Sequence, residues 1–413
     1  MVNHKIINDP VFGFIRIPKG VLYDIVVHRD FFRLSRIKQL GGAYMVYPGA
    51  QHTRFQHSLG AFYLMNKAVS TLQKKGVEIS NEEAEAVEAA ILMHDIGHGP
   101  FSHVLEHTLI SGVAHEEISL MIMEKLNREM DGRLSLAIKI FKDEHPKHFL
   151  HQLISSQLDM DRLDYLRRDS FFTGVTEGNI GSDRIIDMLH VQNDNLVIEK
   201  KGIYSIENYL VSRRLMYWQV YLHKTGVAAE HVLINALQRA KDLAKEGVEL
   251  FCSPALHFFL YQDVDKERFL GDEECLEKYL DLDDNDIISA LKVWQAAQDP
   301  ILSLLARDFI GRRIFKVEVM DEEPRLQSAQ ENGSREQKVV AELAERYGVS
   351  LADARKYLTS SLVVGRDMYS TDEDKIEILM KDGTIRDISE ISDMLNVDTL
   401  SKKVRKNFFC YQR

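Results

Sequence analysis

Histidine and aspartate stand close together in one glycine-rich stretch, residues 94–103, which reads HDIGHGPFSH. Imidazole and carboxylate groups are ligands that suit Fe, Mn, Zn or Ni at neutral pH. His94 and Asp95 are adjacent, and His98 and His103 follow at short spacing. Positions that only pack a hydrophobic core rarely hold histidine and aspartate at this density. The His94–Asp95 pair therefore predicts half of a metal site, and the other ligands must come from elsewhere in the chain.

Histidine is also concentrated around this stretch. Seven of the 16 histidines fall between residues 52 and 115, four of them around glycine turns, which indicates a metal or catalytic centre. His57 lies in TRFQHSLG (53–60), near the start of a predicted helix, and is a candidate ligand. His52 and His107 are interpreted as structural.

A carboxylate on a third helix would complete the ligand set. The segment QLDMDRLDY (157–165) contains Asp159, Asp161 and Asp164. In a helix Asp161 and Asp164 share one face, whereas Asp159 points elsewhere. Leucine and methionine in the same segment require part of it to be buried, and a metal would neutralise a buried carboxylate. The spacing alone does not choose between Asp161 and Asp164.

The elements that must position these residues are predicted to be mainly helical. The chain has 8 prolines in 413 residues and long stretches with a hydrophobic period near 3.6. Ser80, followed by acidic residues, predicts the N-cap of a helix that delivers His94 and Asp95 at its C-terminal end. Further helices are expected at 29–40, 55–74, 115–128, 147–168, 205–224 and 227–246.

The composition changes after about residue 312. KVEVM (316–320) is typical of a strand, residues 336–347 of a helix, and the turn at Gly383 of a hairpin between 375–380 and 384–388. We therefore predict a mainly α protein, with a helical domain over residues 1–315 and a small α+β C-terminal domain over residues 316–413.

Composition also limits the class of partner. The formal net charge of −11 gives no general reason to expect long nucleic acid or an anionic membrane as a partner. Three scattered cysteines without CxxC spacing favour a reducing compartment and argue against both a disulfide framework and a cysteine-ligated zinc site. The N-terminal residues lack a signal-peptide pattern, and no apolar run approaches the length of a membrane span. We expect a cytoplasmic protein.

Several motifs in order resemble those of the HD-domain phosphohydrolases. Within that superfamily the chain is similar to the deoxynucleoside triphosphate (dNTP) triphosphohydrolases of the SAM-and-HD-domain type. The four-ligand H…HD…D pattern is specific for the superfamily, and GGAYMVYPGA and DRLDYLRRD narrow it to this branch. The resemblance covers most of the first 320 residues and is carried by NDPVFGFI (8–15), IKQLGGAYMVYPGAQHTRFQHSLG (37–60), LMHDIGHGPFSHVLEH (92–107), AHEEIS (114–119), LDMDRLDYLRRDSFFTGV (158–175) and SRRLMYWQVYLHK (212–224).

The resemblance implies roles for individual residues at the metal. The metal ligands would be His57, His94, Asp95 and Asp161. The acid–base residues would be His98 and His103, with Glu106 orienting the second histidine, and His115 would be a further active-site histidine. The metal itself, divalent or trivalent, could be Fe, Mn, Zn, Ni or Mg.

The resemblance also implies substrate contacts. Arg54 and Arg162 would hold the α- to γ-phosphates, and Arg213 the terminal phosphate. Gln39, Leu40 and Asp169 would contact the sugar and exclude ribose by a tight fit at the 2′ carbon. Tyr165 would pack beneath the sugar, and Tyr221 would stack near the base.

Two features bear on selectivity and regulation. Leu222 stands where relatives can carry a polar residue near the base. Arg312 and Lys316 resemble contacts to a regulatory nucleotide. The helix face with Val27, Phe32 and Ser35 lacks the acidic and basic pair that would grip guanine, so guanine specificity is not supported.

The expected reaction is metal-dependent attack at the α-phosphorus of a dNTP, which releases a deoxynucleoside and inorganic triphosphate. Arginine forks suit the triphosphate charge, and a histidine can protonate the departing 5′ oxygen. We also expect a homo-oligomer, a dimer or a tetramer. The alternatives are an HD phosphohydrolase that acts on another nucleotide or a nucleic-acid end, and a non-catalytic nucleotide-sensing scaffold.

Overall fold

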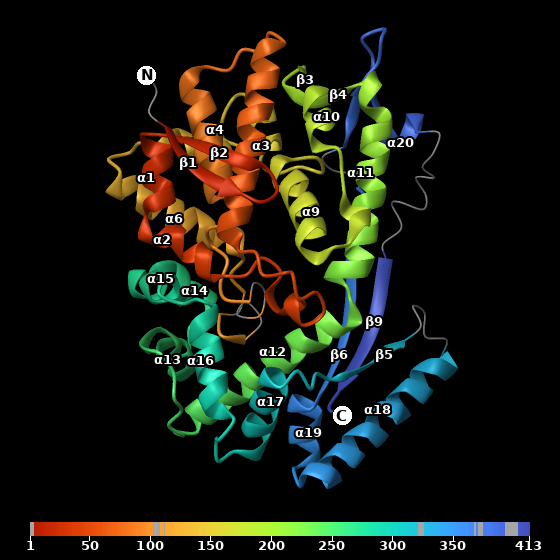
Figure 1. Cartoon of the computed structure of the whole chain (residues 1–413). Coiled ribbons are helices and arrows are strands. Elements are labelled where there is room, and N and C mark those ends of the chain that lie inside the picture. The colour runs from red at the N-terminus through yellow and green to blue at the C-terminus, as the bar shows by residue number, and fades with distance from the viewer. Residues whose placement is uncertain are drawn as a thin grey trace.

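Helices dominate a computed structural model of the chain, in which an upper and a lower group of helices meet at the middle (Figure 1). The structure describes residues 4–101, 104, 108–110, 112–320, 326–366, 369–370, 375–392 and 404–413, with the backbone alone at 326–332, 364–366 and 404–405. The prediction of a mainly α protein with small sheets towards the C-terminus is confirmed.

The upper group holds the N-terminal hairpin and the helices that carry the predicted metal ligands (Figure 1). The hairpin strands are β1 (His4–Asp9) and β2 (Gly13–Pro18). The helices of this group are α1 (Val21–Val27), α2 (Arg29–Phe32), α3 (Arg54–Lys74), α4 (Asn81–Met93), α6 (His115–Glu129), α7 (Ser135–Phe141), α8 (His148–Gln152), α9 (Met160–Thr173), α10 (Ser182–Asp187) and α11 (Ile203–Met216), with 3-10 turns η1 (Arg33–Arg36), η2 (Gly41–Met45), η3 (Thr176–Gly178) and η4 (Lys200–Gly202).

The lower group follows in the second half of the chain. A π-helical turn, η5 (Tyr217–Tyr221), leads from α11 into the long α12 (Lys224–Lys245). α13 (Pro254–Tyr261) and α17 (Pro300–Ile310) pack against α12, α16 (Asp284–Trp294) packs on α17, and α15 (Glu273–Leu280) lies against α13 and α14 (Lys266–Gly271).

The C-terminal residues form parts of two sheets. β5 (Lys316–Met320), β9 (Val404–Tyr411) and β6 (Thr359–Arg366) make one antiparallel sheet in the order β5-β9-β6, beside α18 (Leu326–Tyr347) and α19 (Leu351–Tyr357). β7 (Glu377–Leu379) and β8 (Ile385–Asp387) form the predicted hairpin, followed by α20 (Ile388–Ile391).

The hairpin also extends a sheet that begins in the first part of the chain. β7 pairs in parallel with β4 (Asn195–Glu199), which is paired with β3 (Leu189–Gln192). This pairing crosses the predicted boundary at residues 315/316. The division into two domains stays a prediction.

The helices that carry the ligands begin with side-chain caps. Ser80 Oγ accepts the N–H of Glu83, and the Glu83 carboxylate accepts the N–H of Ser80, so the predicted start of α4 is confirmed. Thr53 and Gln56 form a similar capping box at the start of α3. The first N–H groups of a helix have no hydrogen-bond acceptor within the helix. Because these side chains accept from such N–H groups, they fix where each helix begins.

Three predicted helices are broken in the structure. The helix expected at 29–40 becomes α2 and η1, after which Lys38 forms an isolated bridge with Thr53. The helix expected at 147–168 divides into α8 and α9, because Asp159 accepts the Arg162 N–H and caps a new start. The helix expected at 205–224 changes to π geometry at Tyr217.

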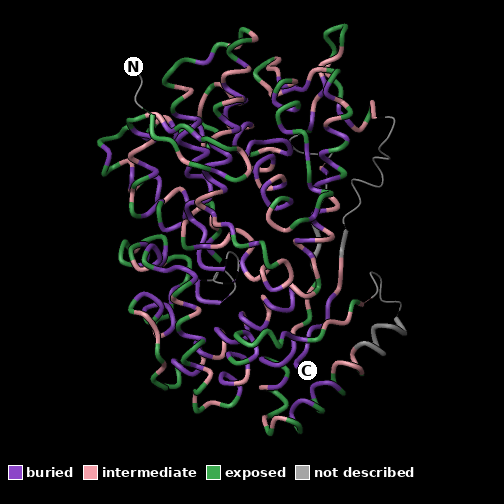
Figure 2. The backbone as a smooth tube through the Cα atoms, viewed as in Figure 1, coloured by how far each residue is buried: buried purple, intermediate pink, exposed green. Residues whose placement is uncertain are grey.

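Buried residues run through the interior of both groups (Figure 2), and most of the buried apolar side chains belong to one continuous core. It runs from Ile15 of β2 to Tyr411 of β9. Within the part of the chain that the structure describes, no helix is long and apolar enough to cross a membrane.

One buried carboxylate in this core gives a pH-dependent stability. Burial raises the pKa of Glu88 on α4 to about 7, partly opposed by the hydrogen bond from Asn66 Nδ2 on α3, at 2.8 Å. The folded state therefore binds more protons than the unfolded state between pH about 4.5 and 7, and stability falls as the pH rises through this window.

Replacing Glu88→Gln removes this ionisation and keeps an oxygen for Asn66. We expect the variant to be more stable than the wild type by about 3 kcal/mol at pH 8 and nearly equal to it at pH 4.5. Urea unfolding of both proteins at the two pH values measures the difference, with exposed Glu124→Gln on α6 as the control. An equal difference at both pH values would contradict the role of ionisation.

Candidate metal centre and active site

Four side chains from three helices meet at one point. His57 comes from the first turns of α3, His94 and Asp95 directly follow α4, and Asp161 comes from the first turn of α9. Asp161 Oδ1 lies 3.1 Å from His57 Nε2 and 3.4 Å from His94 Nε2. The two carboxylate oxygens of Asp95 lie 3.5 Å from His94 Nε2 and 3.7 Å from His57 Nε2. Ligand atoms held about 2.0–2.2 Å from one ion lie about 3.0–3.5 Å apart, so this spacing fits a metal.

The protonation of the two imidazoles also fits a metal. His57 Nδ1 lies 2.6 Å from Asp164 Oδ2, and His94 Nδ1 lies 2.7 Å from the carbonyl oxygen of Ile91. Since these oxygens accept hydrogen bonds, the ring proton of each neutral imidazole belongs on Nδ1 and the lone pair on Nε2. The two Nε2 atoms are 3.3 Å apart, and both face the carboxylates. A cation between them would resolve the repulsion of these lone pairs.

The charge balance leads to the same conclusion. Burial lowers the pKa of His57, but its hydrogen bonds with Asp161 and Asp164 outweigh burial and raise the pKa to about 10. Burial raises the pKa of Asp161, but His57 and His94 hold it well below its usual value. The carboxylates therefore need a positive charge beside them, and a metal ion held by these residues would supply that charge in place of the extra proton.

Asp161 and Asp164, which the sequence could not separate, have different positions. Asp161 faces the Nε2 atoms, whereas Asp164 is fully buried behind His57 and also accepts from Arg168 Nε at 3.0 Å. Arg168 Nη1 in turn donates to Asp9 Oδ2 at 2.7 Å. Burial raises the pKa of Asp164, but Arg168 and His57 hold it below its usual value, so the carboxylate stays charged and orients the His57 ring.

A glycine allows this buried network to form. A Cβ on Gly60 would lie 1.9 Å from Asp164 Oδ1 and 2.1 Å from Arg168 Nη2. Since any side chain would collide there, α3 and α9 reach this separation only with glycine at position 60. Gly60 was not predicted as a site residue, although it lies three residues after His57 in TRFQHSLG (53–60).

The turn after α4 brings two further histidines beside the metal ligands. His98 Nε2 lies 3.8 Å from Asp95 Oδ1, and the rings of His98 and His115 are 3.7 Å apart between centroids. Asp95, His98 and His115 form a second group of possible metal-binding atoms. The assignment of His98 as an acid–base residue and of His115 as a further active-site histidine stays a prediction. His103, Glu106 and His107 lie outside the described residues.

Ser119 of α6, which the sequence analysis did not single out, supports this turn. Its hydroxyl donates to the His94 carbonyl and accepts the Gly97 N–H, at 2.8 and 2.9 Å. A Cβ on Gly97 would lie 2.2 Å from the His115 carbonyl oxygen, so glycine lets α6 pack directly on the turn.

Three predicted phosphate contacts have different surroundings. Arg54 Nη1 lies 2.5 Å from Asp95 Oδ2, directly at the metal centre. Arg162 uses Nε to contact Ser156 and Asp159, at 2.6 and 3.1 Å. Arg213 is 6% exposed, and its Nε and Nη1 have no hydrogen-bond partner among the described residues.

Arg162 and Arg213 act on one another. Burial and Arg162 lower the pKa of Arg213, and Tyr209 and Tyr165 more than offset both. Arg162, which acts on both Arg213 and Asp161, thus adds a second guanidinium group here, and buried N–H groups of this kind call for an anionic partner.

The predicted sugar and base contacts lie around one aspartate. Asp169 accepts hydrogen bonds from His52 Nε2 and from the Tyr221 hydroxyl, both at 2.7 Å. The rings of Tyr165 and Tyr221 meet edge to face at 6.0 Å. Gln39 joins this group because its N–H donates to the His52 carbonyl at 3.0 Å.

His52 was interpreted as structural, and its bond to Asp169 adds it to this group. Leu40 follows Gln39 and is partly buried against the core. Tyr217, also missed, lies with Tyr221 in the π-helical turn at a ring distance of 5.1 Å. π-helical turns occur frequently at functional sites.

The two predicted regulatory residues, Arg312 and Lys316, do not line the same cavity. Arg312 lines a cavity of about 520 Å³ between η2, α16 and α17, and its Nε donates to the Met45 carbonyl at 2.8 Å. Lys316 does not line this cavity; its Nζ lies 3.7 Å from Glu318 Oε1. None of the predicted metal ligands lines this cavity either.

Comparison with protein families matches two parts of the chain. Residues 54–169, from Arg54 to Asp169, match the HD domain, and residues 180–251 match the HD associated region. The HD match contains all four predicted metal ligands.

Two relatives and one solved structure extend this result. YwfO of Bacillus subtilis is 33% identical over 420 residues, which cover 98% of this chain and 92% of YwfO. Human deoxynucleoside triphosphate triphosphohydrolase SAMHD1 is 30% identical over 282 residues, 58% of this chain and 45% of that protein. A crystal structure of a phosphohydrolase from Bacteroides thetaiotaomicron superposes with a TM-score of 0.95 at 62% identity and covers 100% of both chains.

The contact behind His57 gives a direct test of the metal centre. Asp164→Asn keeps the shape of the side chain but removes the charge that orients His57. We expect it to weaken metal affinity by about 10- to 100-fold. Calorimetric titration of chelator-treated protein with Mn²⁺ measures the effect. Asp183→Asn, an exposed aspartate that pairs with Lys67 of α3, is the control. Equal affinity in all three proteins would contradict the proposed centre.

Proposed function

The chain belongs to the HD phosphohydrolase superfamily, and from that membership we propose that it hydrolyses dNTPs to a deoxynucleoside and inorganic triphosphate. Hydrolysis of a phosphate ester is the superfamily's chemistry, and the identity of the substrate is what we propose in addition. Similarity to SAMHD1 supports the choice, although this chain spans 45% of the human protein.

The observation that carries the choice is the buried cation Arg213. A guanidinium that is 6% exposed, with two nitrogen atoms unpaired among the described residues, is costly to bury unless an anion binds it. Arg162 adds a second positive charge next to Asp161. A chain of phosphates that runs from the metal towards Arg213 would satisfy both groups, and arginine forks match phosphate oxygens.

The sugar end of the substrate would lie on the Asp169 group. The carboxylate already accepts from His52 and Tyr221, which fixes its orientation, and it has lone pairs left for a sugar hydroxyl. Gln39 and Leu40 would bound the same space and leave no room for a 2′ hydroxyl. Tyr165 and Tyr221 would offer their rings to the sugar and the base.

The reaction needs an activated water and a proton for the leaving group. A divalent or trivalent metal held by the four ligands would polarise the phosphoryl group and activate the attacking water. His98 and His115 lie at contact distance beside Asp95, so either imidazole could hand a proton to the departing 5′ oxygen. His103 and Glu106 are proposed for the same step from the resemblance alone.

The fate of the substrate separates this proposal from the alternatives. Incubation with Mn²⁺ or Mg²⁺ and each dNTP or NTP, singly and in mixtures, should yield deoxynucleoside and intact triphosphate from deoxynucleotides only. Chromatography of the products measures this. Monophosphate with pyrophosphate, or single phosphates, would refute the proposal and leave another HD phosphohydrolase activity.

The turnover assay and gel filtration together test the remaining expectations, which are a regulatory nucleotide, a homo-oligomer and a non-catalytic scaffold. Turnover that appears only in mixtures would support a regulatory nucleotide near Arg312 and Lys316. Gel filtration with and without nucleotide tests the proposed homo-oligomer. Absence of turnover in every mixture would favour a nucleotide-sensing scaffold.

Substitution of Arg213 tests the phosphate contact. We expect Arg213→Ala to lower kcat/KM for a dNTP by about 10²-fold, since one charge-assisted contact to the triphosphate is lost. Arg213→Lys should recover part of the loss, because it restores the charge without the fork. Half-buried Arg214→Ala, the next residue of α11, is the control. Equal losses in the Arg213 and Arg214 variants would argue against a specific contact.

A further inference from the structure

One buried carboxylate of a distant helix holds two segments of the active site. The N–H of Lys38 donates to Asp284 Oδ2, and the N–H of Phe101 donates to Asp284 Oδ1, each at 2.9 Å. Asp284 is the first residue of α16 and is 4% exposed. Lys38 directly precedes the predicted sugar contacts, and Phe101 follows the His98 turn in the glycine-rich stretch. The two segments are 37–41 and 97–101.

The local backbone explains why Lys38 needs this partner. Lys38 forms a β-bridge with Thr53. The N–H of Gln39 donates to the His52 carbonyl, and the N–H of Arg54 donates to the Ile37 carbonyl, so this bridge uses the backbone groups on either side of Lys38. The Lys38 N–H therefore faces the other way, towards α16. An ionised carboxylate is well suited to the position because it accepts from both N–H groups and donates to neither.

The two segments also touch each other. A Cβ on Gly41 would lie 3.4 Å from the Phe101 carbonyl oxygen, and Phe101 itself has a φ of 52°. Movement of one segment would therefore displace the other unless both are held from outside.

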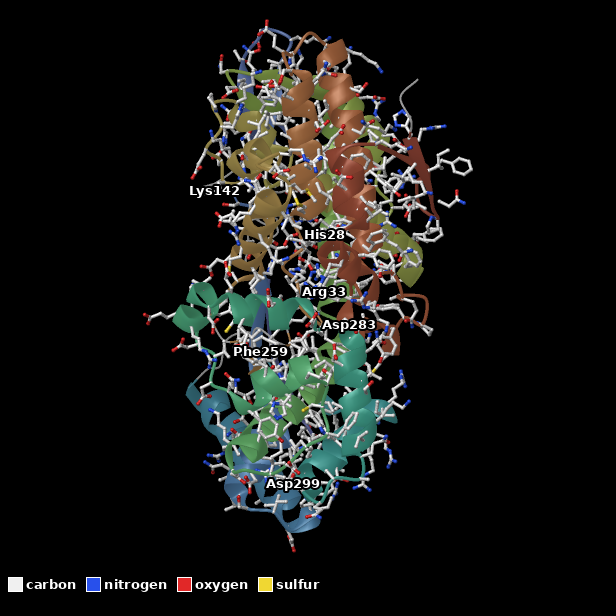
Figure 3. The ribbon with its side chains drawn as sticks, turned by 90° about the vertical axis from the view of Figure 1, so that its left-hand side faces the viewer. His28, Arg33, Lys142, Phe259, Asp283 and Asp299 are labelled. Carbon is white, nitrogen blue, oxygen red and sulfur yellow. The ribbon has the colours of Figure 1, made fainter. Side chains whose placement is uncertain are left out.

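Neighbours of Asp284 hold the rest of the turn. The Tyr279 hydroxyl donates to the Gly97 carbonyl at 2.7 Å. Arg33 Nη2 donates to the carbonyls of Ile96 and His98 at 3.0 Å, while its Nη1 donates to Leu282 at 3.1 Å. Figure 3 labels Arg33 and Asp283 at the narrow middle of the molecule, where the N-terminal helices meet the teal helices.

We propose that Asp284 is a positioning residue that sets the spacing between segments 37–41 and 97–101, and through it the discrimination between deoxyribose and ribose. The sugar role rests on the proposed function, whereas the bridge itself does not. The two hydrogen bonds to the Asp284 carboxylate among the described residues come from backbone N–H groups, so it acts through Gln39, Leu40 and His98 and not on the substrate.

The first test measures the bridge without any substrate. Asp284→Asn keeps the size of the side chain, but its amide NH₂ cannot accept an N–H. We expect hydrogen exchange of the full-length protein to become about 10- to 100-fold faster in peptides covering both segments. Asp387→Asn is the matched control, because Asp387 is a buried aspartate that likewise accepts from two groups, Ser389 N–H and the Tyr369 hydroxyl. Exchange that stays unchanged in both segments, or that becomes equally fast in Asp387→Asn, would overturn the proposal.

The second test measures discrimination. We expect Asp284→Asn to lower the ratio of kcat/KM for a dNTP to that for the matching NTP by about tenfold, and Asp387→Asn to leave the ratio unchanged. A general loss of folded protein would lower both rates and spare the ratio. An unchanged ratio in Asp284→Asn overturns the specificity role. If the wild type hydrolyses no triphosphate, the proposed function has failed, and hydrogen exchange alone decides whether Asp284 bridges the segments.

Discussion

The hydrogen bond between Asp164 and His57 is the interaction on which the rest of the centre depends. It lies in the interior, where an unpaired carboxylate would be costly, and Arg168 and Asp9 complete a fully hydrogen-bonded chain of charges. That chain ties the N-terminal hairpin, α3 and α9 together through one point. Because the same bond places the His57 proton on Nδ1, the element packing that stabilises the fold also directs a lone pair at the metal.

This constraint explains why close helix packing matters more here than any single ligand. The carboxylate oxygens of Asp95 and Asp161 lie 3.1–3.7 Å from the two imidazole Nε2 atoms, and a side chain at position 60 would hold α3 and α9 apart. Gly97 has the corresponding role between the turn and α6. Both glycines lie in the segments that carry ligands, so the centre requires the close approach that glycine permits at these two positions as well as the ligands themselves.

The second half of the chain completes the site from the other side. α11 supplies Arg213, and the π-helical turn that follows brings Tyr217 and Tyr221 towards α9. α15 and α16 hold the glycine-rich turn through Tyr279 and Asp284. Residues separated by almost 200 positions therefore form one surface around the metal centre, and the continuous hydrophobic core keeps these elements in place.

Residue types and their local spacing are enough to predict which side chains could do chemistry and which helices carry them. Histidine and aspartate types, local spacing, and the cap at Ser80 act over a few residues, so they can be recognised without a fold, whereas the cap at Asp159, which divides the expected helix 147–168, was not predicted. Tertiary structure decided which acidic residue faces the metal and which supports His57, where the helix after residue 29 ends, and that Asp284 reaches two distant segments. These depend on which helices approach one another and on which backbone groups remain unpaired once they do, and neither quantity is contained in local spacing.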